Sequence, residues 1–554
     1  MTSNGLPIPA TTINLRPGAV LPIGLACDEP LSGGEELPTA VTAAIAELLQ
    51  RLDASFRQVV AANSDYFSGE PALCRIVTLP SAAMLRLPSG DGMQTVALDT
   101  VTGPAAPDRA REQAHQLLLA NIDLLFVVWD GNRAERRGGI DALVQLAVIR
   151  KLPVIVVAPT LPAQVHMLLQ GDDDLDAPIA LDLERRQLPA DLTPLVRGIM
   201  IPAWAGARRC LLELCAQPAR PRSLRLEYDL LLAIFRARPQ PSNPPAAAVS
   251  TILPPRNDVP AEFKIRTERI DELARYYAGL SRSSSTSEFL VLIIIALLSS
   301  VLGLLVPSLA GTSIVIQVIV NGLLLVDITI RRKHRWVERW LDYRALAERL
   351  RAVQTLHPIG RGDGEKRAGR GNQFHTWTDW YGRRLQRTLA PPKGPLRDAE
   401  LPVIADGLRA TLDDQLAYHR RAFIVFRRLG RRLHSAAHVA LLATVATGVV
   451  TFAVSLLPIT AIEPWHRIAL LALAVLPAVV SAFNGIRADA DLAQLAERSA
   501  LTVSRLKRLR RELNGAPLTQ DRVINAAIRL AHLMEDELSE WRLMLHNRRL
   551  RRSG

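Results

Sequence analysis

The sequence predicts a two-part protein. An α/β domain with a doubly wound parallel sheet comes first, and an all-α membrane region with four transmembrane helices in two hairpins and cytosolic amphipathic helices follows. Three observations lead to this prediction. Short apolar runs alternate with helical patterns over roughly the first 160 residues. Four long apolar windows come later, and basic residues flank each pair of them.

Composition narrows the classes of function. The chain has 554 residues, 49% of them hydrophobic, and a formal net charge of +13. A basic balance suggests nucleic acid or an anionic membrane surface as partner. The arginines cluster beside the apolar windows and no zinc or RNA-binding motif is found, so the lipid bilayer is favoured and nucleic acid is disfavoured.

The cysteines and the N-terminus predict a cytosolic, reduced first domain. The four cysteines fit no metal motif and no disulfide framework. The first twenty residues lack the apolar core of a signal peptide. We therefore expect the N-terminal domain to stay in the cytosol and the chain to carry no metal site.

The N-terminal domain, residues 1–160, is predicted from strands and helices in alternation. The predicted strands are Val20–Ala26, Cys74–Leu79, Gln94–Leu98, Asp123–Trp129 and Pro153–Val157, and the predicted helices are Glu36–Val60, Pro107–Ala120 and Gly139–Arg150. This alternation is typical of a parallel, doubly wound sheet. Residues 161–236 have a mostly helical pattern, and residues 237–261 form a Pro-rich linker.

Two hairpin units follow, over residues 262–400 and 401–554. Their predicted spans are residues 289–306 and 314–330 in the first unit, and 436–457 and 468–486 in the second. Arg331–Arg335 follows the first hairpin, and Arg427–Arg432 precedes the second. Because both basic clusters lie at the same end of their hairpins, both termini are predicted to be cytosolic.

Several polar and small residues stand out within the spans. Gln317 and Asn321 lie four apart on one face, and either line a pore or hydrogen-bond between helices. Asp327 is close to the cytosolic end of its helix, where it can reach water or Arg331. Ala440, Thr444 and Gly448 form a small-residue stripe suited to close helix packing. We expect the membrane helices to form a homo-oligomer.

The two units carry related strings. Asp271-Glu-Leu-Ala-Arg precedes the first hairpin and Asp414-Gln-Leu-Ala-Tyr precedes the second. Leu-Ala-Glu-Arg follows each hairpin, at residues 346–349 and 495–498. These matches indicate a tandem duplication, although Ala- and Leu-rich helices also match by chance.

A ligand site is predicted at the carboxyl edge of the sheet, where open parallel sheets bind their ligands. Asp130 and Gly131 follow a buried strand, and Gly138 and Gly139 precede a helix. Glycines at a helix N-terminus let backbone amides approach a phosphate, and Asp130 is suited to a ribose hydroxyl. The alternative is an ordinary loop with Gly for its turn and Asp as a cap. Gly24, Asp28 and Arg86 are further candidates.

Two stretches of the sequence resemble known families. Asp123-Leu-Leu-Phe-Val-Val-Trp-Asp-Gly131, followed by Gly138-Gly139, resembles the SLOG superfamily of Rossmann-like domains, and Tyr343–Leu350 beside the hairpins resembles the SLATT membrane modules. The resemblance implies a bacterial conflict-system protein in the inner membrane, with a cytosolic nucleotide sensor that controls a membrane effector. A nucleotide-derived ligand is the only cofactor implied.

The sequence leaves three functions open. No nucleophile with a paired acid and base is found, so no catalytic residue is assigned and a non-enzymatic effector is favoured. A membrane scaffold is the second reading, because Ile23–Glu29 and Ser81–Arg86 lack the polar turns usual in the resembled family. A membrane-tethered nucleotide-processing enzyme is the third.

Overall fold

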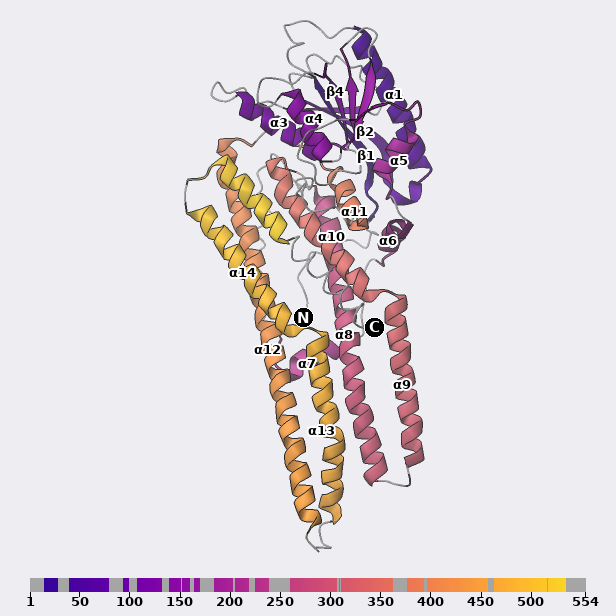
Figure 1. The fold of residues 1–554 in the computed structure, drawn as a ribbon, viewed down its shortest axis with the longest axis vertical. Coiled ribbons are helices and arrows are strands. Elements are labelled where there is room, and N and C mark those ends of the chain that lie inside the picture. Colours follow the sequence, from indigo (N-terminus) through magenta and orange to yellow (C-terminus); the bar gives the residue numbers. More distant parts are fainter. Residues whose placement is uncertain are drawn as a thin grey trace.

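A computed structural model shows a sheet domain at one end of the molecule and long helices that project from it (Figure 1). It describes residues 14–27, 39–78, 93–98, 107–131, 139–150, 152–159, 164–169, 184–202, 205–218, 225–238, 260–305, 308, 310–361, 376–392, 396–456, 463–515 and 517–534. Most of the predicted linker therefore lies outside the described residues.

The sheet has seven described strands in the order β3-β2-β1-β4-β5-β6-β7. Their bounds are Gly18–Cys27 (β1), Ser68–Thr78 (β2), Met93–Leu98 (β3), Leu124–Val128 (β4), Val154–Val157 (β5), Val165–Leu169 (β6) and Glu184–Gln187 (β7). Strands β1 to β5 pair in parallel, whereas β6 and β7 pair antiparallel. The predicted parallel sheet is therefore a mixed sheet. The two additional strands fall in residues 161–236, where a mostly helical pattern was expected.

Apolar side chains bury both faces of the sheet. One core joins alternate residues of β1, β2, β4 and β5 to α1 (Thr39–Ala61) and α5 (Thr193–Met200). The other core joins the remaining residues of these strands to α3 (Pro107–Asn121) and α4 (Ile140–Ile149). This arrangement explains why β4 and β5 read as unbroken apolar runs, since both faces of these central strands are covered.

Long helices build the rest of the chain. After α6 (Ala205–Cys215) and α7 (Glu227–Ile234), the helices are α8 (Ala261–Leu305), α9 (Ala310–Lys333), α10 (Trp336–Leu356), α11 (Trp377–Gln386), α12 (Leu401–Ser455), α13 (Glu463–Asp489) and α14 (Leu492–Asn514). The helix expected before the first span and the span itself form one continuous helix, α8. At 45 residues α8 is about 65 Å long, so it extends well beyond a hydrocarbon core of about 30 Å.

Four helices among the described residues are long and apolar enough to cross a membrane, as predicted. They are α8, α9, α12 and α13, and their apolar windows are almost entirely unburied within the chain. Helices of this kind satisfy their own backbone hydrogen bonds and leave apolar side chains to the lipid. The chain is therefore a multi-pass membrane protein in contact with the bilayer.

The four spans stand in a single row, in the order α9–α8–α13–α12 (Figure 1). Extended contacts join α8 to α9, α8 to α13, and α12 to α13. Gly448 of the predicted small-residue stripe faces α13, since a Cβ there would lie 3.7 Å from Leu473. At the next contact Gly485 of α13 lies against the ring of Phe289 on α8. Small residues thus bring neighbouring backbones together.

The two hairpin units share one plan. Each has a long helix, a returning span and a further helix on the side of the sheet domain. In each unit a non-glycine residue with positive φ separates the last two helices: Arg335 (φ 51°) between α9 and α10, and Asp491 (φ 49°) between α13 and α14. Such residues are uncommon outside glycine, so their repetition at one place in both units agrees with the predicted duplication.

Candidate functional site

The predicted ligand edge lies where the strand order reverses, between β1 and β4. The chain leaves β4 through Trp129 to Asp130, which is exposed, and then to Gly131, which has a φ of 91°. That left-handed φ favours glycine. Gly139 is the N-cap of α4, with extended backbone (φ −69°, ψ 173°) and no side-chain cap. Backbone amides at this helix start suit an anionic group.

The remaining predicted ligand residues have different positions. Asp28, Arg86 and Gly138 lie outside the described residues. Gly24 lies within β1 rather than at its end, and a Cβ there would come within 2.6 Å of Cδ1 of Ile122. Close packing against Ile122 thus explains this glycine, and among the described candidates the structure brings Asp130 and Gly131 to the sheet edge.

A buried ion pair lies at the opposite end of β4. Asp123 directly precedes the strand and is 5% exposed, and it pairs with Arg384 of α11 and with Arg387, the C-cap of that helix. Nε of Arg387 donates to a carboxylate oxygen of Asp123 at 3.0 Å, and its other nitrogens donate to the carbonyls of Ala120 and Ile122. We call Asp123, Arg384 and Arg387 the clamp.

Electrostatics keeps the clamp ionised. Burial by itself would raise the pKa of Asp123, but the guanidiniums of Arg384 and Arg387 outweigh it and the pKa lies below its ordinary value. Burial lowers the pKa of Arg384, although the Asp123 carboxylate opposes that shift. An arginine nevertheless stays protonated at any physiological pH, so the clamp is a charged pair sealed between the sheet and α11.

Within the first hairpin unit, α11 also binds α10. Its N-cap Thr376 and Asp379 form a capping box, and Asp379 also pairs with Arg349 of α10. The indole N–H of Trp377 donates to Asp342 of α10 at 2.8 Å. Helix α11 is therefore fixed to the sheet at one side and to α10 at the other.

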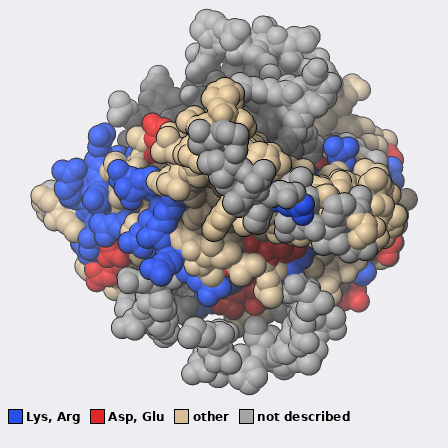
Figure 2. All heavy atoms as spheres, turned by 90° about the horizontal axis from the view of Figure 1, so that it is seen from below, with Lys and Arg blue, Asp and Glu red and all other residues tan. Residues whose placement is uncertain are grey.

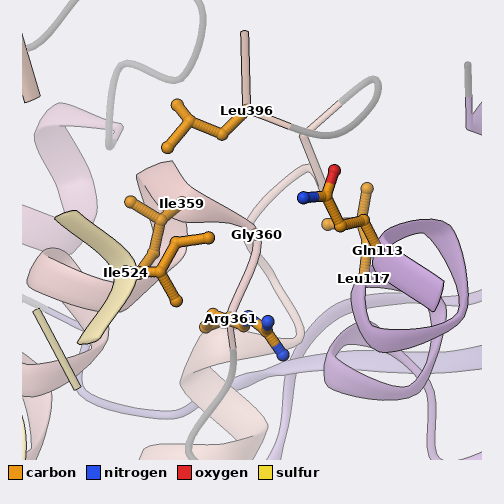
Figure 3. A pocket seen from close by; sticks show the side chains of 7 residues that line it. All are labelled: Gln113, Leu117, Ile359, Gly360, Arg361, Leu396 and Ile524. Carbon is orange, nitrogen blue, oxygen red and sulfur yellow. The ribbon is translucent and has the colours of Figure 1, made fainter. Parts of the chain in front are cut away.

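A second junction joins the sheet domain to the second hairpin unit. The amide of Gln113 on α3 donates to Gln520 at 3.0 Å, at the start of the helix over residues 520–534. Beside it is a pocket of about 20 Å³, lined by Gln113, Leu117, Ile359, Gly360, Arg361, Leu396 and Ile524 (Figure 3). That volume suits one water molecule, so this pocket is no nucleotide site.

The polar residues of the spans are hydrogen-bonded locally. Gln317 donates to the hydroxyl of Ser313 at 3.1 Å, and Asn321 donates to the backbone carbonyl of Gln317 at 2.9 Å. Asn321 is exposed about halfway along α9.

Asp327 is held at the sheet-domain end of the spans. It pairs with Arg225, which precedes α7, and accepts a hydrogen bond from Ser284 of α8 at 2.8 Å. Arg331, which the sequence offered as its partner, pairs with Glu288 of α8 instead. Both acids thus tie the middle of α8 to the last turns of α9.

Basic residues gather on one side of the molecule. Seen from the end of the spans, Lys and Arg side chains concentrate on the side where α12 and α14 lie (Figure 2). Exposed members on these helices are Arg420, Arg427, Arg428, Arg431, Arg432, Arg505, Lys507, Arg508, Arg510 and Arg511. The residues of α12 lie beside its predicted span and suit anionic headgroups.

The clamp was not predicted from the sequence. Its signals were available: Asp123 is an acidic residue directly before an apolar strand, and three arginines recur within five residues at 383–387. Asp123 and the arginines that pair with it are about 260 residues apart in the chain. No rule of sequence spacing connects such distant positions.

Comparisons with known proteins identify no relative. No family model, no curated protein and no solved structure matches the chain.

Proposed function

We propose that this chain is a bacterial inner-membrane effector in which a nucleotide bound to the sheet domain controls the membrane helices. The observation that carries the proposal is the position of β4. Asp130 and Gly131 follow its carboxyl end, and the clamp holds its amino end to α11. Asp130 at the ligand edge is thus seven positions, about 23 Å of extended chain, from Asp123 at the contact with the membrane part.

The sheet domain would act as a doubly wound, SLOG-type sensor. Support comes from the reversal of strand order between β1 and β4 and from helices on both faces. The hairpin units would be SLATT-type modules with both termini cytosolic. Support for this orientation comes from Arg331–Lys333 at the end of α9 and the arginines of α12, which lie at the same end of the row.

Coupling would run from the ligand edge through β4 to α11 and α10. A ligand shifts a two-state equilibrium only by its difference in affinity for the two states. In this scheme the loop after β4 and helix α11 change conformation together. A nucleotide that binds one conformation of the loop more tightly would therefore favour the conformation of α11 that goes with it. Since α10 is joined to α9 by the Arg335 break and also packs on α8, movement of α10 would reach both spans of the first unit and open a pore.

A binding experiment on the full chain in detergent tests the sensor. Thermal unfolding is measured with a panel of mononucleotides, dinucleotides and cyclic nucleotides. A ligand at about 100 times its Kd adds about 2.7 kcal/mol of stability. Asp130→Ala should abolish the shift, whereas Glu47→Ala, at an exposed carboxylate on α1, should preserve it. No shift with any nucleotide contradicts the sensing role.

A second experiment tests the coupling in dye-loaded liposomes. The nucleotide identified above should cause leakage in the wild-type chain. Trp377→Phe keeps an aromatic ring but removes the hydrogen bond to Asp342, so binding should persist while leakage falls. Binding without leakage in the wild-type chain would contradict the effector role.

A membrane scaffold is the second candidate, and Gly24 favours it. The side chain of Ile122 occupies the space next to Gly24, so the backbone of β1 is not open to a phosphate at this position. The scaffold predicts that no nucleotide raises the unfolding temperature. A nucleotide-processing enzyme would instead convert its ligand to a product that chromatography detects.

A further inference from the structure

The Arg335 and Asp491 breaks allow residues of α9 to be matched with residues of α13. Counted back from each break, Val326 matches Ala482, Thr329 matches Gly485, and Ile330 matches Ile486. The two helices run in the same direction, because each returns from its hairpin turn toward the sheet domain (Figure 1). Matched residues therefore point the same way along the row.

The matched faces have different surroundings. Ala482 and Ile486 are 0% and 4% exposed, because this face of α13 lies toward α8 and the cluster around it. Val326 and Ile330 of α9 are 54% and 41% exposed. Among the described residues the extended contacts of α9 are with α8. The position that joins the two units on α13 is thus exposed on α9, at the end of the row.

The other end of the row carries the complementary face. Phe289 of α8 lies against Gly485. Counted back from the helix ends Leu305 and Ser455, Phe289 matches Val439 of α12, which is 67% exposed. The row therefore ends in an α13-like face on α9 and an α8-like face on α12.

Polar residues mark one flank of the row. Asn321 of α9 is exposed, and so are Ser481 and Asn484 of α13. Ser481 and Asn484 match Leu325 and Ile328, which lie four and seven residues after Asn321 and share its side of the helix. Amides within a span tend to face protein or water rather than lipid. A row surrounded by lipid on both flanks would not meet that preference.

We propose that a second copy of this chain packs its α12 against α9, repeating between chains the contact that α13 makes with α8 within one chain. Such a head-to-tail contact uses two different faces, so each added copy leaves both faces available for the next. In the proposed assembly the rotation from copy to copy closes the rows into a ring, with the flank of Asn321, Ser481 and Asn484 on its enclosed side. The proposal concerns the membrane part alone and does not depend on nucleotide binding.

Disulfide cross-linking of the full chain in membranes tests the interface. The double variant Thr329→Cys/Val439→Cys places thiols at the positions that match Gly485 and Phe289. Both positions are exposed, so the substitutions should leave folding intact. Oxidation should convert most of the double variant to dimers and a ladder of larger species. The wild-type chain gives the baseline, since its cysteines, Cys27, Cys74, Cys210 and Cys215, lie outside the spans.

Two comparisons decide the outcome. Phe289→Cys/Gly485→Cys is the matched pair within one chain, and it should cross-link without a change in the number of chains. Thr329→Cys alone and Val439→Cys alone should stay monomeric in a head-to-tail ring. A double variant that stays monomeric after oxidation overturns the proposal. So does cross-linking of Thr329→Cys alone to the same extent, because it would place α9 against α9.

Discussion

The two hairpin units carry the same Leu-Ala-Glu-Arg string in different surroundings. In the first unit Glu348 and Arg349 are 2% and 7% exposed: Glu348 is ion-paired with Arg351 of α10, and Arg349 packs against α11 and is ion-paired with Asp379. In the second unit Glu497 is exposed. The strings also differ in register: Leu346 lies eleven residues after the Arg335 break, and Leu495 lies four after Asp491. The difference of seven residues is about two helical turns, so both strings keep the same face of their helix.

This comparison shows that the neighbours of a repeated helix decide whether its charged side chains are buried or exposed. Helix α10 lies beside α8 and α11, so its charges are buried and tie the sheet domain to the first unit. Helix α14 packs on α12 and leaves Arg505, Lys507 and Arg508 exposed. We expect the first unit to transmit changes in the sheet domain and the second to present a basic surface.

The largest effect is expected at the clamp. Asp123→Ala leaves Arg384 buried without its carboxylate, which should reduce the free energy of unfolding by about 3–5 kcal/mol. The measurement is unfolding of the full chain in mixed detergent micelles. Asp413→Ala, at the exposed pair with Arg510, is the control and should cost at most about 1 kcal/mol. An equal loss of unfolding free energy in both variants would contradict the larger contribution expected from the buried clamp.

The stability of the folded chain should respond to pH through His115, which is buried on α3. Burial, with a contribution from Arg111, lowers the pKa of His115 to about 4. In the unfolded chain the pKa is about 6.5, so the unfolded state binds the proton first. Stability present above about pH 6.5 should be lost as the pH falls to about 4, by about 3 kcal/mol.

His115→Gln separates this effect from other groups. Unfolding free energies measured at several pH values should fall less steeply for the variant over that interval. An unchanged slope would show that His115 is not the group responsible.

The contact between α13 and α8 should be sensitive to a single added methyl group. A Cβ at Gly485 would lie 2.2 Å from the Phe289 ring, so Gly485→Ala should cost about 1–3 kcal/mol by overpacking. Gly322→Ala on α9 is the matched control, because nothing lies within 4 Å of its Cβ position. That variant should be neutral or stabilise the helix by up to about 1 kcal/mol. Similar losses at both glycines would contradict the difference between α9 and α13.

The smallest effect is expected where the middle of α8 meets the last turns of α9. Ser284→Ala removes a hydrogen bond to Asp327 but leaves its ion pair with Arg225, so the loss should be about 1 kcal/mol. Thr329→Ala, whose hydroxyl donates to the carbonyl of Leu325 in its own helix, is the comparison and should cost less. Thermal unfolding of both variants measures the difference.

The sequence by itself determined the local elements, because periodicity and apolar length depend on neighbours along the chain. Strands β1, β4 and β5 and the four spans lie where their patterns placed them, and Gly448 packs as its stripe predicted. Glycine at position 131 agrees with the turn expected after β4.

Only the tertiary structure decided which distant residues meet. It paired Asp123 with Arg384, gave Asp327 to Arg225 rather than to Arg331, filled the space at Gly24 with Ile122, and ordered the spans as α9–α8–α13–α12. It also turned β6 and β7 antiparallel at the edge of the sheet. The physical reason is that packing and ion pairing act between surfaces, and residues hundreds of positions apart share a surface only after the chain has folded.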